Sequence, residues 1–309
     1  MGPYGAGKSH ALVAARDLAL ASGYDACSVT LDSAQSALNH PQRFLHGLLE
    51  TMRLGNSQRG YSNILTSLLE DPKATEKLAE VAGGCFDTNT WLDGEIRWRF
   101  DSLPSAGSDD AVLRRDELVR ALNGERLIAA TGSRAAAYRL LTFAIRAVRI
   151  AGGAGLVVTL DEVESIFTKL PGRLSQRGAY RVLAALLCGI EDSSLRVVLG
   201  VTPDAWEWLV QDLPFAHNQT SCLTIEPIDQ LAEYATGVPT YVCHPISKKE
   251  MARILDRIRE LHRSLYGAIE DEDSWQRQRQ AATERRGPVR LAIRYAVNFL
   301  DAQRWRGIA

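Results

Sequence analysis

The feature that most constrains this chain is the glycine-rich segment GPYGAGKS at residues 2–9, which matches the pattern GxxxxGK[ST] at every fixed position. Glycines let a backbone wrap closely round phosphate groups with φ values that other residues resist. The backbone N–H groups, and the N-terminus of the helix predicted to follow, then bind the anion. We expect Lys8 to reach the β- and γ-phosphates of a nucleotide and Ser9 to ligate Mg²⁺. Nucleotide contacts are predicted for Gly2, Pro3, Tyr4, Gly5, Ala6, Gly7, Lys8, Ser9 and His10.

The apolar pattern after this loop predicts alternating helices and strands. A helical pattern runs on to Gly23, which is expected to end it. Strands that are apolar throughout are typical of parallel sheets, which are buried on both faces. Buried strands of this kind are predicted at 155–160 and 196–201, a further strand at 26–31, and weaker strand candidates at 221–225 and 240–243. The alternation predicts an α/β fold with a parallel sheet.

A long segment between the first two strands, about 34–150, is predicted to be a mostly helical insert. Breaks between its helices are expected at Gly55-Asn56, Asp71-Pro72, Gly83-Gly84 and 103–110. Another helix is predicted at about 178–190. We therefore predict one nucleotide-binding core over 1–246 that includes this insert.

The last part of the chain, 247–309, is predicted to be a small all-helical domain. Ser247 and Glu250 have the spacing of a capping box at the start of a helix. A polar run over 270–287 follows that helix, and Pro288 begins a final one. The apolar residues expected to face inward are Met251, Ile254, Leu255, Ile258, Leu261, Leu265, Ala292, Ala296, Val297 and Leu300.

Two acidic residues follow the second predicted strand directly. A buried strand of this kind delivers Asp161 to the Mg²⁺ beside a phosphate-binding loop. The next residue, Glu162, is placed to act as general base on an attacking water. The pair favours hydrolysis by water over phosphoryl transfer to another substrate. No guanine-reading NKxD pattern follows, so ATP is the expected nucleotide.

Three further polar groups are candidates for the same site. Thr202 ends the third predicted strand, on the edge of a doubly wound sheet that faces the ligand, and could sense the γ-phosphate; it is also an ordinary strand exit before Pro203. Arg290, or Arg294 one turn later, could close over the γ-phosphate from the helical lid. An arginine acting on a neighbouring subunit is expected among Arg173, Arg177, Arg181 and Arg196, and the sequence does not choose between them.

These motifs, in this order and with a helical C-terminal lid, resemble an AAA+-type P-loop ATPase near the origin-recognition branch. The segments GPYGAGKSHALVAARDLAL, RFLHGLLETMRLGNSQRGYSNIL, RIAGGAGLVVTLDEVESI and PVRLAIRYAVNFLD are similar to the BREX ATP-binding proteins (BrxD type) of bacterial phage-defence loci. The resemblance implies ATP and Mg²⁺ as ligands and a role in restricting phage DNA. It also implies homo-oligomers, or hetero-assemblies with other defence proteins.

One departure from that fold is expected. A phosphate-binding loop normally follows a buried strand in the middle of the sheet, whereas here Met1 stands directly before Gly2. We therefore expect the first core strand to be missing, and the strands that carry Asp161 and Thr202 to lack a central neighbour.

Composition excludes several other classes of protein. Apolar residues make up 46% and charged residues 24% of the 309 residues, which argues against a disordered or fibrous chain. No apolar run approaches the length of a membrane span, so we expect a cytoplasmic protein without membrane contact. The cysteines contain no CxxC pair and predict neither a zinc site nor disulfides; they are Cys27, Cys85, Cys188, Cys222 and Cys243.

The charge is uneven along the chain and leaves more than one function open. Residues 1–247 hold 22 basic and 28 acidic residues, and residues 248–309 hold 14 and 9. The basic end is either a solvated helical face or a contact with phosphate or an acidic partner. The main prediction is an ATP-hydrolysing switch or motor. The alternatives are a nucleotide-gated binding module with little hydrolysis and an origin-recognition-like ATPase that binds DNA directly.

Overall fold

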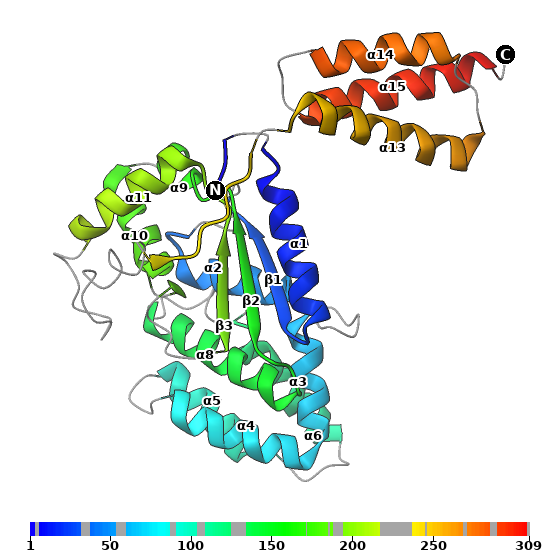
Figure 1. Ribbon diagram of the computed structural model, residues 1–309. Helices are drawn as coiled ribbons and strands as arrows, with labels where there is room; N and C mark the ends of the chain where they lie inside the picture. Colours follow the sequence, from blue (N-terminus) through cyan, green and yellow to red (C-terminus); the bar gives the residue numbers. More distant parts are fainter. Residues whose placement is uncertain are drawn as a thin grey trace. The chain divides into compact units, whose positions relative to one another are not determined.

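The computed structural model describes residues 1–3, 6–31, 38–53, 60–86, 91–103, 109–124, 134–170, 172–184, 186–187, 194–216, 237–244, 246–267, 271–284 and 289–307. The chain divides into two compact units (Figure 1). The larger unit is Ser9–Thr240, and the smaller one combines Met1–Lys8 with Tyr241–Ala309.

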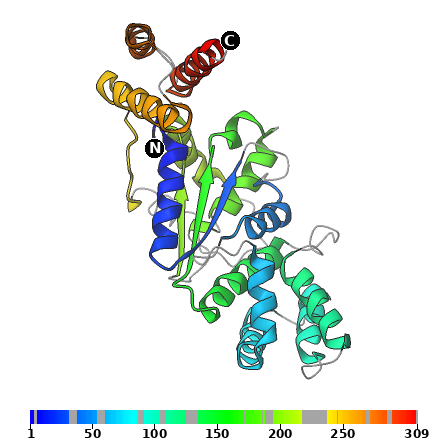
Figure 2. The same cartoon turned by 90° about the vertical axis from the view of Figure 1, so that its right-hand side faces the viewer.

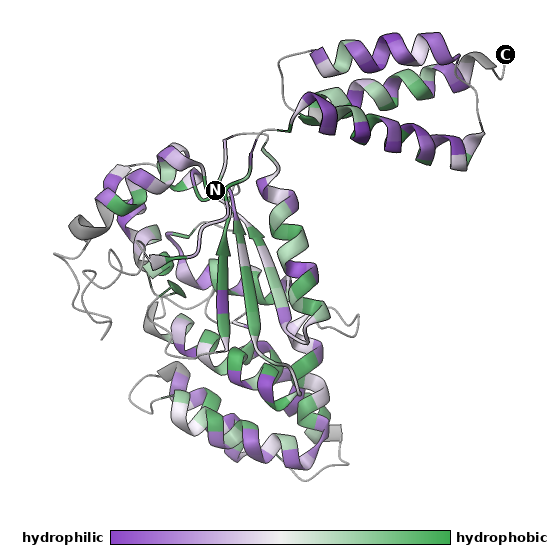
Figure 3. Cartoon of the chain, viewed as in Figure 1, coloured by the Kyte–Doolittle hydropathy of each residue, from purple (hydrophilic) through white to green (hydrophobic). Residues whose placement is uncertain are grey.

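A parallel sheet of three strands lies at the centre of the larger unit. Its order is β1 (Asp25–Thr30), β2 (Leu156–Asp161), β3 (Leu195–Leu199), so the three stronger strand predictions are confirmed with small shifts at their ends. The register sets Thr30 opposite Asp161. The central strand β2 is buried along all but its last residue, and it is largely hydrophobic in Figure 3. The predicted burial of the third strand is only partly confirmed, because in β3 Leu195 is buried whereas Arg196 is exposed and the last three residues are half-buried.

The strand pairing corrects one expectation. Because β1 and β3 flank β2 on either side, the strand that ends at Asp161 does not lack a neighbour. Within the described residues, β3 pairs with β2 alone. The weak candidate at 221–225 lies outside the described residues, and the one at 240–243 forms no strand.

Helix α1 (Lys8–Ala21) runs alongside the sheet (Figures 1 and 2). It ends as predicted at Gly23, whose φ of +81° is a conformation that glycine adopts without strain. The N–H of Tyr24 donates to the carbonyl of Ala19 at 3.0 Å and closes the last turn. Leu12 is the buried residue of this helix.

The predicted helical region is confirmed where the structure describes it. Its helices are α2 (Pro41–Glu50), α3 (Tyr61–Glu70), α4 (Pro72–Cys85), α5 (Trp91–Asp101), α6 (Asp109–Leu122) and α8 (Arg134–Ile150). Asp71 caps α4, accepting from the N–H of Lys73 at 3.0 Å, as the predicted break there requires. The break predicted at Gly55-Asn56 lies outside the described residues, as does most of 103–110.

The predicted break at Gly83-Gly84 is wrong, because α4 continues through both glycines to Cys85. A glycine inside a helix costs roughly 1 kcal/mol, which tertiary packing can outweigh. Here α4 packs against α8, with Ala82 and Cys85 buried. Arg146 of α8 lies 3.8 Å from where a Cβ on Gly84 would be, and its guanidinium donates to the Cys85 thiol.

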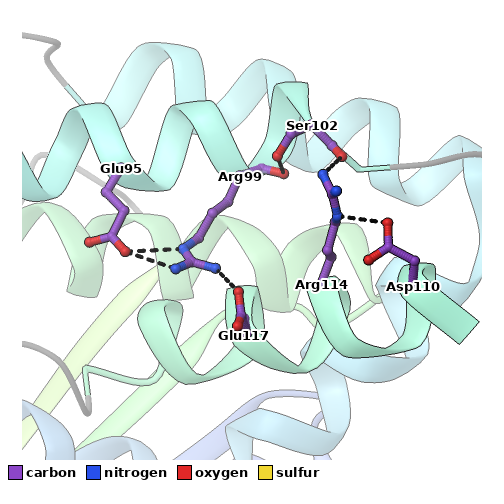
Figure 4. A network of polar contacts seen from close by, with 6 residues as sticks. All are labelled: Glu95, Arg99, Ser102, Asp110, Arg114 and Glu117. Atoms are coloured by element: carbon purple, nitrogen blue, oxygen red, sulfur yellow. Dashed lines mark hydrogen bonds and ion pairs between the residues drawn. The ribbon is translucent and has the colours of Figure 1, made fainter.

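A network of ion pairs joins α5 to α6 (Figure 4). The guanidinium of Arg99 lies between Glu95 on its own helix, at 2.9 Å, and Glu117 on α6. Arg114 of α6 pairs with Asp110 at 3.0 Å and donates to the carbonyl of Ser102 at 3.1 Å. These contacts fix the pairing of two helices whose sequences are otherwise highly charged.

Two helices follow β2, namely α9 (Ser165–Thr168) and α10 (Gly172–Ala184), and α11 (Pro203–Ala216) follows β3. The second begins earlier than the predicted start at 178. The ring of Phe167 packs against Tyr180 and Trp208, with ring centroids 5.9 and 5.4 Å apart, and so ties α9 to the other two helices.

The smaller unit contains a bundle of α13 (Lys248–Tyr266), α14 (Glu272–Glu284) and α15 (Val289–Gly307), each packed against the other two. The predicted capping box at Ser247 and Glu250 is confirmed. Its core consists of Met251, Leu255, Trp275, Ala282, Ala292, Ala296 and Leu300.

Three apolar residues predicted to lie inside the bundle do not. Leu261 and Leu265 are 50% and 71% exposed, and Val297 is 36% exposed. The polar run instead forms α14, largely hydrophilic in Figure 3, which covers the core with Trp275. A three-helix bundle buries a narrower arc of each helix than the apolar stripe occupies.

Within the described parts of the chain, no helix is both long enough and apolar enough to cross a membrane.

Candidate functional site

The predicted phosphate-binding loop lies in the smaller unit up to Lys8, and Tyr4 and Gly5 are outside the described residues. Gly7 has a φ of +89°, the conformation for which the motif needs glycine. The N–H of Ala6 donates to the carbonyl of Pro3 at 3.2 Å. The Lys8 ammonium donates to the carbonyls of Gly2 and Pro3 at 3.0 and 3.4 Å, and so lies across the start of its own loop.

The start of the loop is held by the segment that leads to the bundle. The N-terminal amine of Met1 donates to the carbonyl of Tyr241, and the N–H of Cys243 donates to the carbonyl of Met1, both at 2.6 Å. A Cβ on Gly2 would lie 2.9 Å from the Cβ and the carbonyl oxygen of Cys243. The first glycine of the motif is therefore required by this close approach.

In the larger unit, the edge of the sheet at the carboxyl ends of its strands brings Asp161 close to α1. A Cβ on Gly200, the residue after β3, would lie 2.8 Å from both the Asp161 Oδ1 and the Leu12 Cδ1. The first turns of α1 therefore approach the end of β2 across Gly200. Ser9 precedes Leu12 by three residues, so both lie on the same side of this helix.

The turn that carries Glu162 is bonded to the ends of all three strands. The N–H of Val163 donates to the carbonyl of Gly200 at 3.2 Å, and the Ser165 hydroxyl donates to the carbonyl of Leu31 at 2.5 Å. Leu31 in turn donates its N–H to the carbonyl of Asp161 at 3.0 Å. These bonds fix the backbone on which the predicted general base stands.

Glu162 itself is strained. Its φ is +56°. In the described parts of the chain, every other residue with a positive φ is a glycine. Such conformations are costly for a residue with a Cβ and cluster at functional sites, where the surroundings enforce them. The N–H of Glu162 donates to the Asp161 Oδ1 at 2.9 Å, so the Asp161 carboxylate is held against the backbone of Glu162.

The Glu162 carboxylate is half exposed and forms an ion pair with Lys169, with 3.3 Å between Oε2 and Nζ. A carboxylate in this position can accept a proton from water at the edge of the sheet. Sequence reasoning missed Lys169, Ser165 and Gly200. A lysine seven residues after the acidic pair carries no recognisable signal, because only the turn through α9 brings it back to Glu162.

Thr202 is buried and acts as the cap of α11. Its hydroxyl accepts from the N–H of Ala205 at 3.4 Å, and its carbonyl accepts from the N–H of Trp206 at 2.9 Å. Thr202 therefore has a structural role as a helix cap that does not depend on a bound nucleotide. The γ-phosphate sensor stays a prediction.

The residues predicted to ligate Mg²⁺ suit that ion in their chemistry. Ser9 and Asp161 offer a hydroxyl and a carboxylate oxygen, the hard donors that Mg²⁺ takes alongside waters and substrate phosphates. Among the described residues, no group of three or more His, Cys, Asp or Glu side chains could form a separate metal site. Burial, and then the charge of Asp25, raise the pKa of the Cys27 thiol on β1, so this cysteine is not a nucleophile.

The candidate arginines are scattered over three elements. Arg290 and Arg294 lie in α15; the side chain of Arg290 is outside the described residues, and Arg294 is exposed. Arg173 and Arg177 lie on α10, the first of them exposed. Arg181 is also on α10 without a described side chain, and Arg196 of β3 donates to the carbonyl of Leu195. The described geometry does not choose between them.

Comparison of the chain with family models, curated proteins and solved structures finds no match.

Proposed function

We propose that this chain is an AAA+-like P-loop protein that binds ATP with Mg²⁺ and hydrolyses it. The observation that carries the proposal is the approach of α1 to the end of β2, where Leu12 and Asp161 meet at Gly200. Ser9, the last residue of the GxxxxGKS motif, lies three residues before Leu12 on α1, which supports a site shared with the acidic pair. The two expected magnesium ligands both belong to the larger unit.

Each residue then has a distinct role. The glycine-rich loop and the N-terminus of α1 bind the phosphates, with the Lys8 ammonium exchanging the Gly2 and Pro3 carbonyls for phosphate oxygens. Ser9 and Asp161 would hold Mg²⁺, and the ion would supply neutralisation of charge on the phosphate oxygens. Glu162 accepts a proton from a water molecule while the oxygen of that water forms a bond to the γ-phosphorus. The bond to the bridging oxygen breaks, and ADP and phosphate leave.

The biological setting comes from the sequence resemblance alone. We place the chain as a nucleotide-driven switch or motor in a bacterial anti-phage system of the BREX type. It would act as a homo-oligomer or in assemblies with other defence proteins, contacting DNA directly or through them. An arginine from a neighbouring subunit would complete the site in such an assembly.

A second function, a nucleotide-gated binding module with little hydrolysis, is favoured by one observation. The carboxylate of the predicted base is already held by Lys169. In this function the bound nucleotide itself is the signal, and a general base is not needed.

The test measures ATP binding and phosphate release by the full chain with Mg²⁺. ATP at 100 times its Kd should stabilise the protein by about 2.7 kcal/mol, and Lys8→Ala should lose this stabilisation. Glu162→Gln should retain it but release no phosphate. Binding without phosphate release by the unmodified chain would favour the binding module. Absence of both would exclude the proposed function.

A further inference from the structure

The ion pair between Glu162 and Lys169 joins the predicted general base to a residue with no assigned role. The Lys169 Nζ lies 3.3 Å from the Glu162 Oε2, and the two side chains are 49% and 45% exposed. No nucleotide or metal is needed to form it, because both partners belong to one short stretch of chain.

The fold holds Lys169 within reach of Glu162. The N–H of Ser165 donates to the carbonyl of Glu162 at 2.8 Å, and the N–H of Lys169 donates to the carbonyl of Ser165 at 2.9 Å. These two bonds carry the chain from the strained residue round α9 and back. Ser165 is itself fixed to the carbonyl of Leu31.

Aromatic packing fixes the other side of the same turn. Phe167, two residues before Lys169, packs against Tyr180 of α10 and Trp208 of α11. The backbone of Lys169 is thus held on both sides of the turn. Its ammonium contacts the Glu162 Oε2 at 3.3 Å, so the ion pair fixes the direction in which the carboxylate points and opposes its rotation towards a water elsewhere at the edge of the sheet.

We propose that Lys169 is a positioning residue that restrains the Glu162 carboxylate in an unreactive contact and so lowers the rate of ATP hydrolysis. This inference rests on the ATPase function proposed above and adds a regulated step to it. Exposed ion pairs are weak and exchange readily, so the restraint reduces the rate without abolishing it.

The experiment measures kcat and KM for Mg²⁺-ATP in Lys169→Met, Lys169→Glu and Lys169→Arg variants of the full chain. The Met and Glu variants should raise kcat by about two- to five-fold with an unchanged KM, the range that loss of an exposed ion pair allows. The Arg variant keeps the charge and should retain the original rate. Lys77→Met, which removes an exposed lysine on α4, is the matched control and should change nothing.

The outcomes separate this inference from the function on which it rests. ATP turnover that the Met variant leaves unchanged or lowers would overturn the restraint but keep the ATPase. Turnover no higher than that of Glu162→Gln in both the unmodified chain and the Met variant would overturn both. Turnover that rises in the Met and Glu variants but not in the Arg variant would support both.

Discussion

At the residue scale, Glu162 carries a conflict between stability and activity. Its φ of +56° costs a residue with a Cβ roughly 1–2 kcal/mol, whereas asparagine tolerates this conformation. We expect Glu162→Asn to raise the free energy of unfolding by about 0.5–1 kcal/mol and to abolish ATP turnover. Urea denaturation and phosphate release measure the two effects. Glu162→Gln is the control, since it removes the carboxylate without easing the strain; equal stability of the two variants would contradict the argument.

A second residue-scale prediction concerns Glu272 in the bundle. Hydrogen bonds from Arg259, at 2.6 and 3.1 Å, and then from Gln276 lower the pKa of Glu272 from 4.5 to about 2. Because the folded-state pKa is the lower one, this stabilisation is complete above pH 4.5 and disappears as the pH falls towards 2. Glu272→Gln should therefore destabilise the bundle above pH 4.5 and match the unmodified chain near pH 2.

The NMR signal of the buried Trp275 indole reports this transition, because that side chain lies in the bundle core. Thermal unfolding followed at this signal, at several pH values in the window, compares the two proteins. Parallel loss of stability with falling pH in both would show that Glu272 is not the group responsible.

At the scale of elements, Gly200, the residue that follows β3 in the sequence, lies between α1 and the end of β2. An added Cβ would lie 2.8 Å from Asp161 and Leu12 and has to displace one of them. We expect Gly200→Ala to lower the free energy of unfolding by about 1–3 kcal/mol and to weaken the binding of Mg²⁺-ATP. Gly83→Ala on α4 is the matched control, because open space surrounds that position and the helix should gain about 0.5–1 kcal/mol. Denaturation and nucleotide titration of both variants distinguish these results.

The elements also show how far sequence reasoning reaches. Local patterns predicted the strands and the capping box, because the burial of an apolar run and the spacing of Ser247 and Glu250 are encoded within a few residues. The helix break predicted at Gly83-Gly84 was wrong, because the packing of α4 on α8 outweighs the low helix propensity of glycine.

The polar contacts of the candidate site could not be predicted for a different reason. Asp161 and Glu162 were found because they adjoin an apolar strand. Lys169 and the bond from Ser165 to Leu31 depend on where the turn after β2 leads and on which strand neighbours it. Such contacts arise from the register of the sheet and the direction of α9, and neither leaves a periodic signal in the sequence.

At the scale of the whole molecule, the uneven charge of the chain allows direct DNA binding to be tested separately from ATP hydrolysis. Residues 248–309 carry 14 basic and 9 acidic residues, whereas the rest of the chain is acidic. Lys248, Lys249 and Arg253 are exposed on the first turns of α13. Direct binding through these three would give a slope of log K against log salt of about −2.7, since each neutralised phosphate contributes about −0.9.

This slope makes the DNA-binding function a sharp prediction. The affinity of the full chain for a duplex should fall about forty-fold between 50 and 200 mM salt, measured by fluorescence anisotropy. Replacing the three residues with glutamate should remove binding but leave ATP turnover unchanged. Replacing Lys73 and Lys77 with glutamate is the control, because both lysines are exposed on α4 and their replacement also makes the chain more acidic. Because the two sets change the net charge by about −6 and −4, losses in that proportion would mean that net charge alone, and not α13, attracts the DNA.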